Sequence, residues 1–298
     1  MFSSLSANLR GMAFVFISTS GFASAHGMVR QVSVDLHAFE IVFFRNLFGT
    51  LVILPWFLKQ GWAPLRTRRL KVHIIRIGVS IVSIFTFYMA LIEAPLAQVT
   101  ALSFLGPIIG AFFATLFLGE VVRLRRWLAI FLGFAGTIVV LRPSFGFIEY
   151  GAVLALVSAI GWGISMTITK FLSKTESSVT IISYNVVLMT PLSLFAALFV
   201  WEWPSWIQLA WLAVIGLLTT AASLGFTQAI RDSAINVVMP IDYFRLVWIA
   251  IIGFVFYGEV PTIYTWIGGT MIFASATYIA YRESVLARTN ATASVQPI

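Results

Sequence analysis

Three ionisable residues stand inside stretches that are otherwise apolar, and their types suit the binding of a charged solute. Arg45 lies in segment 36–58, and Asp242 and Arg245 lie in segment 234–257. If both segments are membrane-crossing helices, Arg45 lies about 13 Å and Arg245 about 16 Å from the segment ends. That is near the middle of a hydrocarbon core about 30 Å thick, where ionisable groups are costly and are functional candidates by default. A guanidinium at this depth can grip a pair of carboxylate or phosphate oxygens.

The surroundings of these charges leave alternatives open. Asp242 stands three residues before Arg245, so the two side chains share a helix face. The pair either neutralises itself and pins neighbouring helices, or it presents Arg245 to a cavity. Arg45 has no acid on its own face, because Glu40 is five positions away. Its guanidinium therefore needs water, a backbone carbonyl or a substrate anion.

Further candidate site residues lie deep in apolar segments or beside these charges. Aromatic rings there can stack on a ring of the solute or cover an alkyl chain. Prolines interrupt the helical hydrogen-bond ladder, which is tolerable beside a cavity or packed protein. We predict a substrate site lined by Arg45, Asn185, Asp242, Tyr243, Arg245, Phe44, Tyr88, Trp162 and Tyr184, flanked by helix kinks at Gly106, Pro107 and Pro240.

Composition identifies the elements that must position these residues. Of 298 residues, 60% are apolar and 10% are charged, whereas a typical soluble domain is about 25% charged. The chain is therefore predicted to be an all-α polytopic membrane protein. Apolar runs place ten transmembrane helices at about 9–30, 36–58, 72–92, 95–118, 126–142, 150–170, 178–201, 206–229, 234–257 and 261–281.

The basic residues set the expected orientation. With the N-terminus inside, only Arg30 and Arg142 fall in outer loops, and Arg45 and Arg245 fall within spans. All other Lys and Arg then lie on the cytoplasmic side, as the positive-inside rule requires. Both termini are expected in the cytoplasm, and the net charge of +8 calls for no nucleic-acid partner. The first segment also has a signal-peptide-like end at 23–25, but its counterpart later in the chain favours a retained helix.

The chain repeats itself. A shift of 139 residues superposes the Gly-Glu-Val run 119–121 on the run 258–260, and Trp127 on Trp266. A shift of about 140 pairs Arg45 with Asn185. We expect two five-helix halves, 1–145 and 146–285, followed by a cytoplasmic tail, 286–298. Five is odd, so the halves are inverted relative to each other, as is common in secondary transporters with a midplane site.

These features resemble the EamA-type transporters of the drug/metabolite transporter (DMT) superfamily. The resemblance rests on the ten spans, the two Gly-Glu-Val runs, the stretch 101–120 that is similar to the family's fourth-helix motif, and Arg45 in Phe-Phe-Arg-Asn. It covers nearly the whole chain. It implies a bacterial inner-membrane carrier of small organic solutes, which in this family range from amino acids and amines to nucleotide-related cofactors and flavins.

Other classes find little support in the sequence. The chain has no Cys, and His26, His37 and His73 are scattered near span ends, so no metal site and no cofactor are expected. No nucleophile–base pair indicates an enzyme, and no phosphate-binding loop indicates an ATPase. A channel would repeat its polar lining around a pore, whereas Arg45 and Asp242 have uncharged counterparts. Glu120 and Glu259 at span ends are expected to cap the following helix or to act in gating.

The sequence therefore predicts a secondary active or exchange transporter. Its solute would be an amino acid, an amino-acid derivative or a similar amphiphilic anion or zwitterion, moved by alternating access. Export is the direction expected from the resemblance. The alternative is import of a cofactor-like solute such as riboflavin or S-adenosylmethionine. Besides solute and lipid, no partner is expected, and the protein would be a monomer or a weak homodimer.

Overall fold

The computed structural model describes residues 7–62, 65–118, 124–141, 149–172, 175–176, 178–232, 241–242 and 244–293. The regular secondary structure of these residues is entirely helical. The helices are α1 (Ala7–Val32), α2 (Ala38–Gln60), α3 (Leu70–Glu93), α4 (Leu96–Ser103), α5 (Leu105–Leu118), α6 (Leu124–Leu141), α7 (Tyr150–Leu172), α8 (Ser178–Ala197), α9 (Trp206–Asp232), α11 (Phe244–Tyr257) and α12 (Ile263–Ala293).

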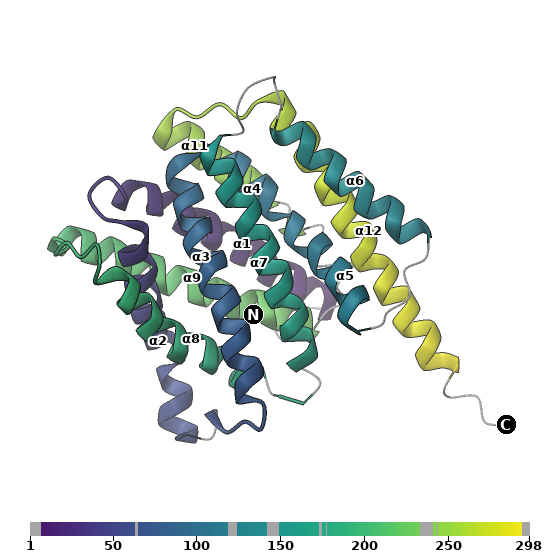
Figure 1. Ribbon diagram of the computed structural model, residues 1–298, viewed down its shortest axis with the longest axis horizontal. Helices are drawn as coiled ribbons and strands as arrows, with labels where there is room; N and C mark the ends of the chain where they lie inside the picture. The colour runs from purple at the N-terminus through teal and green to yellow at the C-terminus, as the bar shows by residue number, and fades with distance from the viewer. Residues whose placement is uncertain are drawn as a thin grey trace.

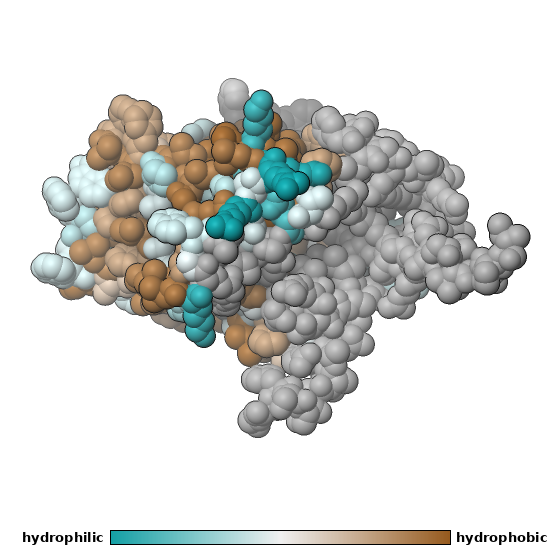
Figure 2. Space-filling model, turned by 90° about the horizontal axis from the view of Figure 1, so that it is seen from below, coloured by the Kyte–Doolittle hydropathy of each residue, from teal (hydrophilic) through white to brown (hydrophobic). Residues whose placement is uncertain are grey.

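The protein is a multi-pass membrane protein. Six of the described helices, α1, α2, α3, α7, α8 and α9, are long and apolar enough to cross a bilayer, and shorter apolar helices accompany them. Large apolar side chains such as Phe131 and Phe195 are well exposed. Figure 2 shows such apolar residues over much of one face, with a few hydrophilic residues among them. This surface suits contact with lipid rather than water.

The helices pack in pairs whose members are far apart in the sequence (Figure 1). α1 packs on α9, α3 packs on α7, and α6 packs on α12 along one edge of the molecule. α2 lies against both α8 and α9. Fully buried side chains, among them Ile41, Tyr88 and Leu246, form one continuous core between these pairs. The arrangement brings α1, α2, α3, α7 and α9 around a common centre.

Local sequence explains where several helices begin and end. At the start of α2, Nδ1 of His37 accepts from the Phe39 N–H, and the Glu40 carboxylate accepts from the His37 N–H. Glu40 also accepts from the backbone N–H of Glu202 at 2.8 Å. Both carboxylate oxygens of Glu40 therefore accept backbone hydrogen bonds, one at the start of α2 and one from the segment that precedes α9.

The predicted span 95–118 is divided into two helices. α4 ends at Ser103, and α5 begins at Leu105, with Phe104 between them. Pro107 follows in the first turn of α5, where its missing N–H costs little; its side chain and the whole of Pro240 lie outside the described residues. At the other end of the chain, α12 continues to Ala293, so the first part of the expected tail 286–298 is helical.

Small residues let α6 and α12 approach closely. A Cβ added at Gly136 would lie 2.7 Å from the backbone oxygen of Gly268 and 2.9 Å from Cβ of Met271. Backbone cannot move aside as the end of a flexible side chain can. The close crossing of α6 and α12 therefore requires a residue without a side chain at position 136, as in other close helix pairs in membranes.

We expect Gly136→Ala to lower the free energy of unfolding by about 1–3 kcal/mol, because the added methyl overpacks the crossing. Gly78→Ala is the matched control, since a Cβ at Gly78 in α3 meets nothing within 4 Å. Thermal melting of both purified variants in the same detergent measures the difference. Equal melting temperatures would contradict the close crossing of α6 and α12.

Candidate functional site

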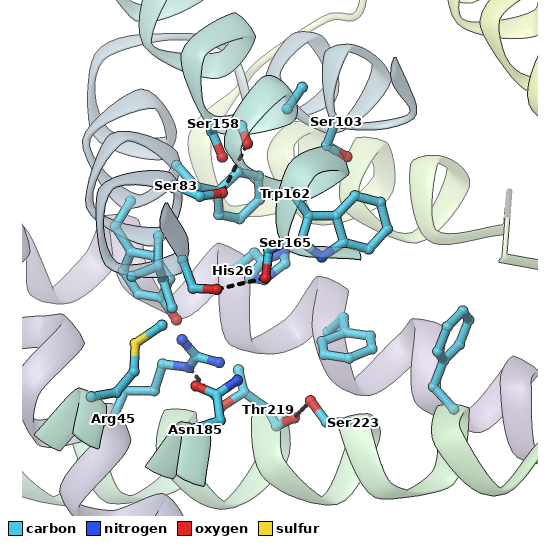
Figure 3. A pocket seen from close by; sticks show the side chains of 18 of the residues that line it. His26, Arg45, Ser83, Ser103, Ser158, Trp162, Ser165, Asn185, Thr219 and Ser223 are labelled. Atoms are coloured by element: carbon cyan, nitrogen blue, oxygen red, sulfur yellow. Dashed lines mark hydrogen bonds between the residues drawn. The ribbon is translucent and has the colours of Figure 1, made fainter. Parts of the chain in front are cut away.

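A cavity of about 320 Å³ lies among α1, α2, α3, α4, α7, α8, α9 and α11 and the segment that leads into α11. Six of the residues singled out in the sequence line it. They are Arg45, Tyr88, Trp162, Asn185, Asp242 and Arg245. Figure 3 shows Arg45 and Asn185 on one side of the cavity, with Trp162 and several serines on the opposite side. Residues separated by up to 200 positions are thus gathered at one place.

Arg45 is held by two neighbouring helices but keeps part of its guanidinium unused. Its Nε donates to Oγ1 of Thr219 in α9 at 3.2 Å. Its guanidinium carbon lies 5.6 Å from the ring centre of Tyr88 in α3, within cation–π range. Nη1 is buried and has no hydrogen-bond partner within the described part of the chain. The side chain is therefore positioned and still has a donor for a ligand.

Asp242 and Arg245 form the second charged group of the cavity. Nη2 of Arg245 lies 3.4 Å from Oδ2 of Asp242, which is long for a charge-assisted hydrogen bond. The guanidinium carbon also lies 5.0 Å from the ring centre of Phe104. Among the described residues, Oδ1 of Asp242 and Nε of Arg245 have no partner. The pair therefore exists and also faces the cavity, so the two interpretations of it are compatible.

Gly106 is explained by Trp162. A Cβ added at Gly106 would overlap the indole ring of Trp162. The absence of a side chain there lets the ring pass between α5 and α7 and reach the cavity lining. Gly106 thus acts by giving room to an aromatic side chain, next to the break between α4 and α5.

Two further predicted residues do not join this group. Phe44 packs among Phe43, Phe48 and Trp201. The ring of Tyr184 stacks on the ring of His73, with 4.4 Å between the ring centres, and its hydroxyl donates to the Leu65 carbonyl at 2.7 Å. The reason is helical geometry. Phe44 and Tyr184 are direct neighbours of Arg45 and Asn185, and successive helical residues point about 100° apart. Tyr243 lies outside the described residues.

The cavity also contains residues that the sequence analysis missed. His26 was expected near a span end, yet it lines the cavity between the rings of Phe22 and Phe87. Serines supply much of the remaining lining. Two serines of α3 face two serines of α7. Oγ of Ser80 lies 2.6 Å from Oγ of Ser165, and the Ser83 hydroxyl donates to the Ser158 carbonyl at 2.8 Å. Their spacings of three and seven residues place each pair on one helix face, which is the signal that could have identified them.

An ion pair closes the helix ends beyond the cavity. Arg30 pairs with Glu259 and also donates to the carbonyls of Ile92 and Ala94, each at 3.2 Å. Glu259 accepts from the Leu96 N–H at 2.8 Å. Glu259 therefore caps α4, and the expectation that it caps the helix that follows it in the chain is corrected. Because Arg30 is one helical turn past His26, this cluster lies just beyond the cavity and ties α1, α3, α4 and the end of α11.

We expect Glu259→Ala to lower the free energy of unfolding by about 1–3 kcal/mol, because it leaves the partly buried Arg30 and the α4 N-terminus without their shared partner. Chemical or thermal unfolding of the purified protein measures the change. Glu202→Ala is the control, since Glu202 is exposed and joins the fold through its backbone N–H. A Glu259→Ala protein as stable as the control would show that the cluster contributes nothing to the fold.

The groups that line the cavity suit the binding of a small polar solute. Within the described ranges no group of three His, Asp or Glu side chains is placed to hold a metal ion. The cavity instead combines two guanidiniums, one carboxylate, hydroxyls and aromatic rings. These groups can hold a small solute by ion pairing, hydrogen bonding and ring contact.

Sequence comparison gives a consistent picture. The profile of the EamA-like transporter family matches residues 9–142 and again residues 149–281. The riboflavin transporter of Rhizobium johnstonii is 32% identical over 242 residues, which are 81% of this chain and 80% of that protein. The S-adenosylmethionine uptake transporter of Rickettsia felis is 27% identical over 92% of this chain and 94% of its own.

A third relative has a different named activity. The pseudopaline exporter of Pseudomonas aeruginosa is 27% identical, over 88% of this chain and 93% of its own length. One solved crystal structure covers 93% of this chain and 98% of its own, with a TM-score of 0.61 at 20% identity. That likeness concerns the fold alone.

Proposed function

Because this chain belongs to the EamA-like transporter family, we propose that it is a secondary carrier of a small organic solute whose binding site is the cavity around Arg45 and Arg245. The solute is an amino acid, an amino-acid derivative or a similar amphiphilic anion or zwitterion. The protein moves it across the bacterial inner membrane by alternating access, as an exporter or exchanger. It acts by binding and release and not as an enzyme.

The observation that carries this proposal is the pair of guanidiniums with unused donor atoms in one cavity between apolar helices. Arg45 and Arg245 both line the cavity, and Nη1 of Arg45 and Nε of Arg245 are buried and lack protein partners among the described residues. Leaving such groups unpaired in an apolar interior is costly. A solute with carboxylate or carbonyl oxygens satisfies them, while Trp162, Phe22 and Phe87 cover its apolar part.

We further propose the architecture of ten spans in two inverted halves, 1–145 and 146–285. Helix packing supports it. Exchanging the two halves turns the α1–α9 packing into α7–α3, α5–α7 into α11–α1, and α2–α9 into α8–α3, and all of these packings occur. The α6–α12 and α2–α8 packings map onto themselves and also occur. A carrier built in this way has its site between the halves.

Alternating access then requires that one end of the cavity is shut while the other opens. The cluster of Arg30 and Glu259 ties helices together at one end. Given cytoplasmic termini, which the distribution of Lys and Arg supports, this is the outer end. The proposed protein works as a monomer or weak homodimer without an ATPase subunit.

Import of a cofactor-like solute is the second candidate. The aromatic lining of Phe22, His26, Phe87 and Trp162 fits a planar heterocycle as well as an amino acid. Relatives named for riboflavin transport and S-adenosylmethionine uptake also favour a cofactor-like solute. The two candidates share the cavity and differ in solute and direction.

The proposal is tested first by ligand stabilisation. A panel of amino acids, riboflavin and S-adenosylmethionine is screened for a rise in the melting temperature of the purified protein, which binding to the native state produces by mass action. A solute that stabilises the wild type and not the Arg45→Ala, Arg245→Ala double variant supports the cavity as its site. Stabilisation that survives in the double variant places the site elsewhere.

Transport in proteoliposomes gives the second test. We expect Arg45→Ala and Arg245→Ala each to reduce saturable uptake of the stabilising solute at least tenfold, because each removes a charged contact to it. Arg45→Lys retains the charge but loses the planar fork, so it is expected to restore only part of the rate. Arg68→Ala, an exposed loop arginine, is the control and should transport normally. Unchanged rates in both cavity variants would refute the assignment.

A further inference from the structure

Three hydroxyl groups of the cavity have a fixed hydrogen-bond direction. Ser83 in α3 lies 2.8 Å from the Ser158 carbonyl, Ser103 in α4 lies 2.7 Å from the Thr100 carbonyl, and Thr219 in α9 lies 2.7 Å from the Ile215 carbonyl. A carbonyl oxygen can only accept, so in each pair the hydroxyl is the donor. Each hydroxyl has thereby committed its only proton to the backbone, and its remaining capacity is to accept.

Asp242 adds a stronger acceptor to the same cavity. It is 8% exposed and lines the cavity, and its Oδ1 has no hydrogen-bond partner in the described part of the protein. An ionised carboxylate can only accept. Its Oδ2 faces Arg245 at 3.4 Å, which leaves Oδ1 for another donor.

The cavity therefore offers both donors and acceptors to a solute. The guanidiniums of Arg45 and Arg245 offer donors, from α2 and α11. Ser83, Ser103 and Asp242 offer acceptors, from α3, from α4 and from the segment that leads into α11. A solute that only accepts hydrogen bonds would satisfy the arginines. It would also displace the water that donates to the acceptor groups and could not replace those hydrogen bonds, so its affinity would be lower.

We propose that the solute recognised here carries N–H or O–H donors in addition to the group that binds the arginines. Its class is an amino-, amide- or hydroxyl-bearing solute with a ring, and not a simple aryl or alkyl carboxylate. This inference rests on the proposed carrier function and narrows its substrate class. It requires only that the solute occupy the cavity, whatever the direction of transport.

Matched ligand pairs test the donor requirement. L-Phenylalanine and 3-phenylpropionate share the phenyl ring and the carboxylate, and only phenylalanine has N–H donors. Riboflavin and 3-methyllumiflavin share the flavin ring, and only riboflavin has N–H and O–H donors. Binding to the purified protein is measured by titration calorimetry. We expect the donor-bearing member of a binding pair to bind at least tenfold more tightly, since each unsatisfied buried acceptor weakens binding by about that factor.

The outcomes separate the two proposals. Equal affinity within every pair that binds, or tighter binding of the donor-free member, overturns the donor requirement and leaves the carrier function standing. Failure of all four compounds to bind the folded wild type overturns the proposed solute class, and the donor requirement falls with it.

Two serine variants link the effect to the cavity. Ser103→Ala and Ser20→Ala each remove a hydroxyl that bonds the carbonyl three residues earlier, to Thr100 and Ile17 respectively. Only Ser103 lines the cavity. We expect Ser103→Ala to weaken the donor-bearing ligand about 3- to 10-fold and to leave the donor-free ligand unchanged, while Ser20→Ala alters neither. Equal weakening of both ligands by Ser103→Ala would indicate a merely structural serine and would overturn the assignment.

Discussion

The desolvation of Arg45 is the constraint around which the centre of this protein is built. A guanidinium among apolar helices has lost its water and must be compensated by groups that the protein itself supplies. Here α9 supplies the Thr219 hydroxyl and α3 supplies the face of Tyr88, while Nη1 has no partner among the described residues and the side chain lines a cavity. Three helices that are distant in sequence must therefore meet at one point. The hydroxyls and rings that line the cavity follow from this requirement, since they keep the site polar inside an apolar shell.

The sequence predicted an all-helical protein with several long apolar helices, because apolar helices are visible as local composition. It did not predict which side of each helix faces the cavity. In a soluble protein the polar face of a helix points to water and reveals the buried one. In lipid both faces of a helix such as α8 are apolar, so the pattern carries little orientation. Phe44 and Tyr184 were selected for depth and for a polar neighbour, and their neighbours face the cavity in their place.

Long-range hydrogen bonds were equally inaccessible from the sequence. The capping of α4 by Glu259 joins residues 163 positions apart, and nothing in the local sequence identifies Leu96 as the partner. His26 illustrates the same difficulty. Its position near the end of a predicted span suggested an interfacial residue, and only the packing of α1 against α3 places its ring beside Phe87. The depth of a residue along a helix can be counted from the sequence, whereas the direction of its side chain toward or away from the cavity depends on how the neighbouring helices pack.

The Arg30–Glu259 pair binds both sides of one chain reversal. Arg30 holds carbonyls where α3 ends, and Glu259 holds the N–H where α4 begins. Arg30 is carried by α1, and Glu259 follows the end of α11. Displacement of α1 alone would free the carbonyls at the end of α3, and displacement of the α11 end alone would free the first N–H of α4. The ion pair therefore couples the positions of two distant chain segments to one tight turn between α3 and α4.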